Sequence, residues 1–147
     1  MPEEATTRPT DLCFFTDRGL GSRLLPNALR EAGWVLETMD ERYGKAQSQR
    51  ISDRQWIEEA TLNGDVILCK DLRIATNELE AQAVYMTGAR VFGLANRRLT
   101  GPQMIDTFLT RRSEITEVSL RAQGPYVMSV SLEHALKRLK LAYPAAS

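Results

Sequence analysis

The chain has 147 residues, of which 43% are apolar and 26% are charged. A chain of this length and composition is typical of a single compact domain that buries a core. Its 19 basic and 19 acidic residues balance, so the net charge does not indicate a nucleic-acid or membrane partner.

The amino terminus, MPEEATTRPT, is polar, and every apolar run is far shorter than the roughly 18 residues needed to cross a bilayer. We therefore expect a cytoplasmic protein with no membrane contact. Residues 1–10 are expected to form a flexible tail, and residues 11–147 a single domain. Cys13 and Cys69 lie in short apolar runs and are expected to be buried thiols, not a zinc site.

Short apolar runs predict five strands, at residues 12–16, 34–38, 66–69, 91–94 and 126–130. Apolar residues at helical spacing predict helices between them, together with a polar loop over residues 39–50. Residues 113–124 suit either a helix or an irregular connection. The predicted helices start at Ser22, Ser52, Thr76 and Thr100, with a last helix from Leu132 to Leu141.

Strands that alternate with amphipathic helices predict an α/β fold, a three-layer sandwich with a mainly parallel sheet of about five strands. In such a fold the functional groups lie outside the carboxyl ends of the strands, near the point where the strand order reverses. The acidic residues fit this rule.

Asp17 directly follows the first predicted strand and Asp71 directly follows the third, so both should lie at the carboxyl edge of the sheet. Asp53 begins a helix that starts from the same edge, and Glu78 and Asn96 are further candidates there. Each aspartate alone is also explained as a cap or turn residue. Together, carboxylates without a cluster of His or Cys indicate a Mg²⁺ or Mn²⁺ site.

Basic residues follow or precede these acids in the sequence and are candidates for binding a phosphodiester: Arg18, Lys70, Arg73, Arg97 and its neighbour Arg98. Solvated side chains that only offset carboxylate charge would give the same pattern. The single histidine, His134, is expected on the last predicted helix, away from this edge.

The runs FFTDRGLGSRLLPNALREAGW and ISDRQWIEEATLNGDVILCKDLRI resemble the PIN-like ribonuclease superfamily, in particular the small toxins of bacterial toxin–antitoxin modules. The resemblance covers about Leu12 to Leu109. It depends on a strand that ends in Asp, a later Asp that opens a helix, and a strand followed by Lys-Asp.

The resemblance implies a Rossmann-type topology and a metal-dependent endoribonuclease. Asp17, Asp53 and Asp71 would be the catalytic residues and would bind Mg²⁺ or Mn²⁺, which activates a water for attack on the RNA phosphodiester. Glu78 or Asn96 would fill the fourth acidic position of the family. The implied partners are an RNA substrate and a cognate antitoxin, with a homo-oligomer also open. The apolar face of the last predicted helix suits packing on the sheet or one of these protein contacts.

Two other readings remain open. A phosphoryl-accepting receiver domain also gathers aspartates around Mg²⁺, but such domains usually carry adjacent acids after the first strand and a lysine after the fifth. Here Asp17 lies between Thr16 and Arg18, and Ser131 and Leu132 follow the fifth strand. A non-catalytic binding module, whose acids only cap and solvate, is the second alternative.

Overall fold

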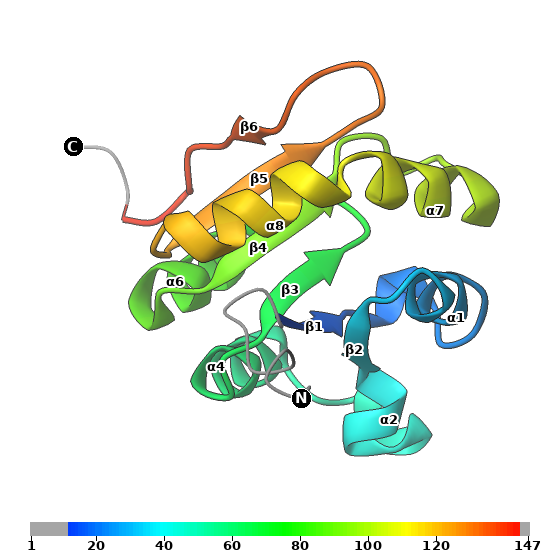
Figure 1. Cartoon of the computed structure of the whole chain (residues 1–147). Helices are drawn as coiled ribbons and strands as arrows, with labels where there is room; N and C mark the ends of the chain where they lie inside the picture. The colour runs from blue at the N-terminus through cyan, green and yellow to red at the C-terminus, as the bar shows by residue number, and fades with distance from the viewer. Residues whose placement is uncertain (1–11, 145–147) are drawn as a thin grey trace, which may run out of the picture.

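The computed structural model describes residues 12–144, and the predicted tail at residues 1–10 lies outside them. The sheet has six strands in the order β2-β1-β3-β4-β5-β6, and β1 to β5 are parallel (Figure 1). The strands are β1 Cys13–Thr16, β2 Val35–Thr38, β3 Val66–Cys69, β4 Arg90–Leu94, β5 Tyr126–Val130 and β6 Lys137–Arg138. The predicted α/β fold and all five predicted strands are confirmed, and β6 is added.

The strand order reverses between β1 and β3. The chain leaves β1 for β2 on one side and then crosses back to place β3 on the other side. The carboxyl ends of β1 and β3 are therefore the point where an open α/β sheet forms its ligand crevice. Register pairs Thr16 at the end of β1 with Leu68 of β3.

Two apolar clusters on opposite faces of the sheet make up the core. Neighbouring strand residues alternate between them, because side chains of a strand point to opposite faces. Phe15 and Ile67 belong to one cluster, while Phe14 and Leu68 belong to the other. Both faces are covered by helices, which gives the predicted three layers.

The first cluster lies under α2 Met39–Tyr43, α4 Asp53–Leu62, α5 Arg73–Thr76 and α6 Glu78–Thr87. The second lies under α1 Leu24–Glu31, α7 Gly101–Thr110 and α8 Arg112–Arg121. Figure 1 shows α8 crossing in front of β4 and β5, while α6 lies behind them. Short elements η2 Arg18–Leu20 and α3 Lys45–Ser48 lie in the connections.

Two predicted helix starts are confirmed in detail. The Ser52 hydroxyl accepts a hydrogen bond from the Gln55 N–H and caps α4. Thr100 and Gln103 form a capping box at the start of α7. These patterns are local, and for this reason the sequence is sufficient to locate them.

Two loop assignments were wrong or incomplete. Residues 39–50 were predicted to be a polar loop, but they contain α2 and α3, because Thr38 and Glu41 form a capping box that starts α2. Residues 113–124, which suited either a helix or an irregular connection, are helical as far as Arg121, where α8 ends. At the first helix the predicted cap, Ser22, is wrong: Arg23 occupies the cap position of α1 and its side chain makes no capping bond.

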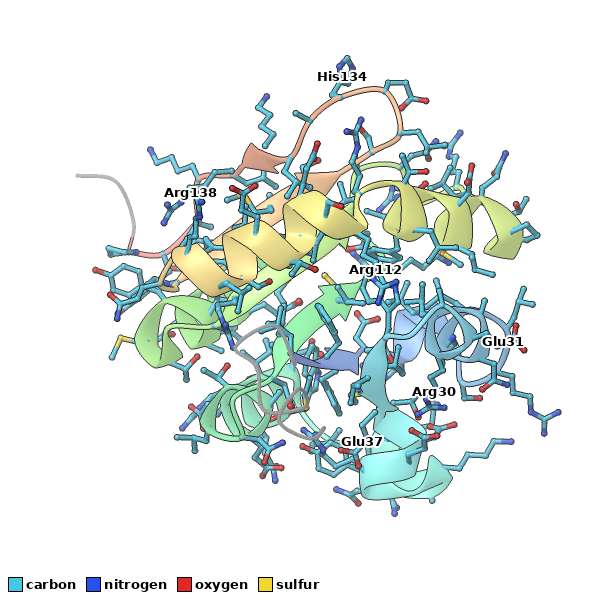
Figure 2. The ribbon with its side chains drawn as sticks, in the orientation of Figure 1. Arg30, Glu31, Glu37, Arg112, His134 and Arg138 are labelled. Atoms are coloured by element: carbon cyan, nitrogen blue, oxygen red, sulfur yellow. The ribbon has the colours of Figure 1, made fainter. Side chains whose placement is uncertain are left out.

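The predicted helix from Leu132 to Leu141 is wrong. The Ser131 hydroxyl accepts the His134 N–H and holds a turn, after which the chain returns as β6, antiparallel to β5. The edge of β5 offers unpaired backbone groups, and the Leu139 N–H donates to the Val127 carbonyl there. His134 therefore lies on the β5–β6 loop (Figure 2).

This strand also changes the role predicted for the apolar residues of the last segment. Leu136 packs on one core cluster and Leu139 on the other, so they share no helix face.

Cys13 was predicted to be buried and is exposed, whereas Cys69 is buried as expected. Within residues 12–144 no helix has the length and apolar character needed to span a membrane.

Candidate active site

The carboxyl ends of β1 and β3 place two aspartates next to each other. Asp17 and Asp71 follow these neighbouring strands, and the Asp17 N–H donates to the Leu68 carbonyl at 3.1 Å. Asp53 is the first residue of α4 and comes to the same edge from the helix side. The three aspartates predicted from the sequence thus lie at the same edge of the sheet, beside the carboxyl ends of β1 and β3.

They line a cavity of about 520 Å³, which we call the carboxylate cavity. A fourth acid, Glu80, lines it as well, together with four cationic side chains. The lining residues are Asp17, Arg18, Gly19, Asp53, Trp56, Cys69, Lys70, Asp71, Arg73, Ile74, Glu80 and Arg97. Glu78 is exposed and is not among them.

Glu80 was missed because the helix start was placed too early. The predicted helix began at Thr76, but the chain breaks at Asn77, whose side chain accepts the N–H groups of Leu79 and Glu80 and caps α6. Glu80 is therefore the third residue of α6 and turns toward the cavity. The spacing of Asn77 and Glu80 is that of a capping pattern, which is the signal the sequence offers for it.

Burial raises the pKa of Asp17 to about 7, and the negative charge of Asp71 adds to this effect. Backbone N–H groups of Gly19 and Leu20 partly oppose it. The side chain is partly exposed as a whole, but its Oδ1 atom is buried and has no hydrogen-bond partner within residues 12–144. An unpartnered buried carboxylate oxygen is costly, and a cation would relieve that cost.

Burial also raises the pKa of Glu80 to about 7, with the charge of Asp53 as the next cause. Asp71 shifts the other way. Partial burial acts to raise its pKa, but hydrogen bonds from the Arg73 backbone and guanidinium, with the charges of Arg73 and Arg97, outweigh it and lower the pKa. The site therefore holds acids of different proton affinity within one cavity, an arrangement common at functional sites.

Neighbouring side chains fix the position of Asp53. The indole N–H of the buried Trp56 donates to its Oδ1 at 2.9 Å, and an Arg18 guanidinium nitrogen lies 3.6 Å from the same oxygen. Arg18 also donates to the carbonyls of Ser48 and Ile51, which ties the start of α4 to the end of β1. Arg18 is thus held by several protein groups as well as lining the cavity.

Two glycines allow the backbone to close around the site. A Cβ at Gly19 would lie 3.0 Å from the Lys70 Cβ and 3.3 Å from the Asp17 Oδ1. A Cβ at Gly93 on β4 would lie 2.8 Å from the Asp71 carbonyl oxygen, closer than real Cβ atoms approach. The turn that carries Asp71 can therefore pack against β4 only because residue 93 has no side chain.

The other predicted residues divide between two cavities. Lys70, Arg73 and Arg97 line the carboxylate cavity with Arg18, as their sequence positions suggested. Asn96 lies instead in a neighbouring cavity, and its Oδ1 accepts the Arg98 N–H at 2.9 Å. Cys69 lies at the floor of the site, where burial and the charges of Asp17 and Asp71 raise the pKa of its thiol.

The carboxylates are neighbours, but they do not converge on a single point. Within residues 12–144 no three His, Cys, Asp or Glu side chains are arranged closely enough to form a ready set of metal ligands. The donor chemistry is nevertheless that of a hard divalent cation: carboxylate oxygens, one of them buried without a partner, and a thiol that stays protonated.

The sheet is mainly parallel, and acidic side chains flanked by cationic ones lie where its strand order reverses. The protein is therefore an α/β protein with a carboxylate site at the carboxyl ends of its strands. The sequence matches the family model described as "PIN like domain" over residues 13–96. It is also 34% identical over 116 residues to the "Putative ribonuclease VapC45" of Mycobacterium tuberculosis, a match that covers 79% of this chain and 83% of that protein. No solved structure matches the chain significantly.

The chain therefore belongs to the PIN-like domain family, and the resemblance noted in the sequence is confirmed. The strand order alone does not establish this, because receiver domains have the same order of the first five strands. The family match and the VapC relative separate the two classes.

Proposed function

We propose that this protein is a divalent-metal-dependent endoribonuclease and the toxin of a bacterial toxin–antitoxin module. The observation that carries the proposal is the carboxylate cavity, where Asp17, Asp53, Asp71 and Glu80 lie beside Lys70, Arg73 and Arg97. The name of the VapC45 relative supports ribonuclease activity as the reaction. We also propose a cytoplasmic location, where the protein would meet an RNA substrate.

The four carboxylates are the proposed ligands of Mg²⁺ or Mn²⁺. Asp17 would contribute its unpartnered Oδ1, and Asp53 is held in place by Trp56. Such an ion would lower the pKa of a bound water and offset negative charge on the phosphodiester during attack. We propose Glu80 as the fourth acid in place of Glu78 or Asn96, because Glu80 alone of the three lines this cavity.

The cationic side chains have a separate role in this proposal. Lys70, Arg73 and Arg97 attract and orient the phosphodiester, because guanidinium and ammonium groups donate charge-assisted hydrogen bonds to phosphate oxygens. Arg73 also holds Asp71, with its backbone N–H donating to Oδ1 at 2.9 Å and a guanidinium nitrogen 3.3 Å from Oδ2. Arg73 would thus contact both Asp71 and the phosphodiester of the RNA.

The antitoxin is the proposed protein partner, and it would cover the carboxylate cavity to block RNA. The homo-oligomer stays a prediction. A receiver domain is disfavoured, because Ser131 and Leu132 follow β5 where a lysine is expected and Asp17 is the only acid directly after β1.

The direct test is cleavage of single-stranded RNA by the purified protein with Mg²⁺ or Mn²⁺. We expect cleavage with either ion and none in excess EDTA, with recovery when the ion is added back, because without the ion no water is activated for attack on the phosphodiester. Products mapped on a sequencing gel distinguish internal cuts from trimming of the ends. Cleavage that persists in EDTA, or no cleavage of any RNA, would favour the non-catalytic module.

The raised pKa values of Asp17 and Glu80 predict how the stability of the metal-free protein depends on pH. In an unfolded chain these acids titrate near 4, whereas in the folded chain both titrate near 7. Between these values the folded state binds more protons than the unfolded state. The contribution of both groups to the free energy of unfolding therefore falls as pH rises from about 4 to about 7 and is constant above that.

The measurement is urea unfolding in EDTA at pH 5, 6, 7 and 8. Asp17→Asn should show a smaller loss of stability across this range than the wild type, and Mg²⁺ should offset the loss in the wild type because it favours the ionised carboxylates. Equal pH dependence in the wild type and Asp17→Asn would contradict the raised pKa of Asp17.

A further inference from the structure

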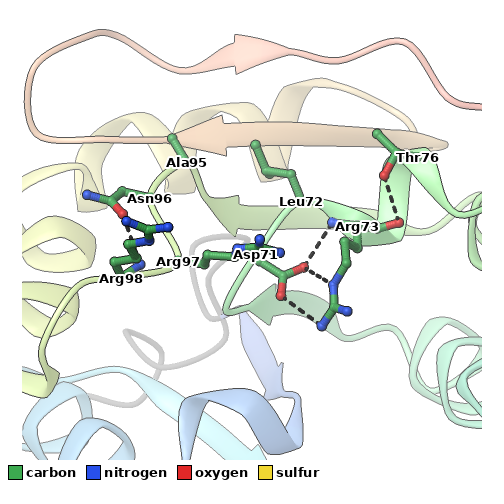
Figure 3. A pocket seen from close by; sticks show the side chains of 8 residues that line it. All are labelled: Asp71, Leu72, Arg73, Thr76, Ala95, Asn96, Arg97 and Arg98. Carbon is green, nitrogen blue, oxygen red and sulfur yellow. Dashed lines mark hydrogen bonds and ion pairs between the residues drawn. The ribbon is translucent and has the colours of Figure 1, made fainter.

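A second cavity, of about 430 Å³, lies beside the carboxylate cavity, and we call it the arginine cavity (Figure 3). Its volume lies within the roughly 300–1,000 Å³ typical of ligand pockets. It is lined by residues of the turn after β3, of α5 and of the loop after β4: Asp71, Leu72, Arg73, Thr76, Ala95, Asn96, Arg97 and Arg98.

The two cavities share a wall. Asp71, Arg73 and Arg97 line both of them. In Figure 3 the Arg73 guanidinium folds back onto Asp71, while Arg97 approaches from the loop after β4. A phosphodiester held at the carboxylates would therefore extend its chain directly over this wall and into the arginine cavity.

The arginine cavity offers groups suited to a nucleotide. Arg97 and Arg98 are exposed, and neither guanidinium has an ion-pair or hydrogen-bond partner among the described residues. Their backbone is held by the bond from the Arg98 N–H to the Asn96 Oδ1, which leaves the Asn96 amide N–H groups without a partner within residues 12–144. Leu72 and Ala95 line the same cavity and supply its apolar surface.

These groups divide into two kinds. The free guanidinium groups suit a phosphate, and the apolar surface with a free amide beside it suits the face and edge of a base. A base can enter such a cavity only when it is unpaired and unstacked, because in an RNA duplex its face is covered by its neighbours. The chemistry thus favours single-stranded RNA over duplex.

We propose that the arginine cavity binds the nucleotide adjacent to the scissile phosphate of single-stranded RNA, with its phosphate at Arg97 and Arg98 and its base against Leu72 and Ala95. This inference rests on the proposed ribonuclease function and adds to it a nucleotide subsite and the path of the strand beyond the scissile phosphate. Arg98 is its most specific residue, because it lines the arginine cavity but not the carboxylate cavity.

The test is the binding of a fluorescein-labelled eight-nucleotide single-stranded RNA, measured by anisotropy in EDTA so that no cleavage occurs. Arg98→Ala should weaken binding by roughly 5- to 10-fold and should lower the slope of log Kd against log salt by about 0.7, the value for one lost phosphate contact on a single strand. A blunt RNA duplex of the same length should bind more weakly to the wild type and lose little with Arg98→Ala.

Arg121→Ala is the matched control. Arg121 is also an exposed arginine, but it ends α8 and lines neither cavity, so its loss should leave RNA affinity unchanged. If the wild type cleaves RNA but Arg98→Ala binds single strands as tightly as the wild type does, the arginine cavity is not a subsite and the ribonuclease function stands. Equal loss with Arg121→Ala, or equal affinity for the duplex, overturns the inference in the same way. A wild type that neither binds nor cleaves RNA removes the proposed function as well.

Discussion

Replacing Asp71 with asparagine should lower the rate of RNA cleavage by about 10²- to 10³-fold, the usual cost of removing one group that stabilises charge at an active site. The amide keeps an oxygen that can accept the Arg73 N–H, as Oδ1 does now at 2.9 Å, so the turn after β3 should keep its shape. The negative charge is lost, and with it the contact of the Arg73 guanidinium with Oδ2, because the amide nitrogen cannot accept a hydrogen bond. The measurement is single-turnover cleavage of one RNA by the wild type and by Asp71→Asn in Mn²⁺.

Asp106→Asn is the matched control for this change. Asp106 is an exposed aspartate on α7 and lines neither cavity, so the same substitution there should leave the rate unchanged. Urea unfolding of both variants checks that each remains folded. Full activity in a folded Asp71→Asn protein would remove the carboxylate cavity as the site of cleavage.

Glu80→Gln should lower cleavage by about 10²-fold or more, while Glu78→Gln should retain nearly the activity of the wild type. The two residues lie two positions apart on α6, yet only Glu80 lines the carboxylate cavity, where burial and, after it, the charge of Asp53 raise its pKa. Glu78 is exposed at the first position of the helix. The measurement is the same single-turnover assay.

This pair of variants tests the assignment of the fourth acid directly. Both changes replace a carboxyl group in the first turn of α6 by an amide of nearly the same shape, so an effect of side-chain shape on the helix end is shared. A larger loss with Glu78→Gln, or equal losses, would show that Glu80 is not the fourth acid. The rise in melting temperature of each variant as Mn²⁺ is added measures binding of the ion and does not depend on cleavage.

The comparison of Glu80 with Glu78 shows where prediction from the sequence stopped. The sequence contains a helix between β3 and β4, and its apolar spacing is local, so its presence could be predicted. Its first residue depends on Asn77, which ends α5 and caps α6. A shift of two residues at a helix start changes which side chain faces a neighbour, because each residue turns the helix by about 100°.

The last segment shows the same limit for a whole element. Leu132, Leu136 and Leu139 have a spacing that suits a helix face, and this prediction was wrong. The free edge of β5 offers backbone hydrogen bonds that the segment takes up as β6, and Leu136 and Leu139 then pack on opposite faces of the sheet. A short apolar pattern does not carry information about an edge that other segments create.

Apolar period, caps and turns are local properties, so the five strands, the well-capped helices and the position of Asp17 and Asp71 at strand ends could be predicted without the packed structure. Only the packed chain shows that β1 and β3 are neighbours, that Glu80 lines the carboxylate cavity beside the three aspartates and that Gly93 lets the Asp71 turn approach β4. These features depend on the order of strands and on contacts between distant segments. Cavities form between elements, so their linings are known only once the elements are packed.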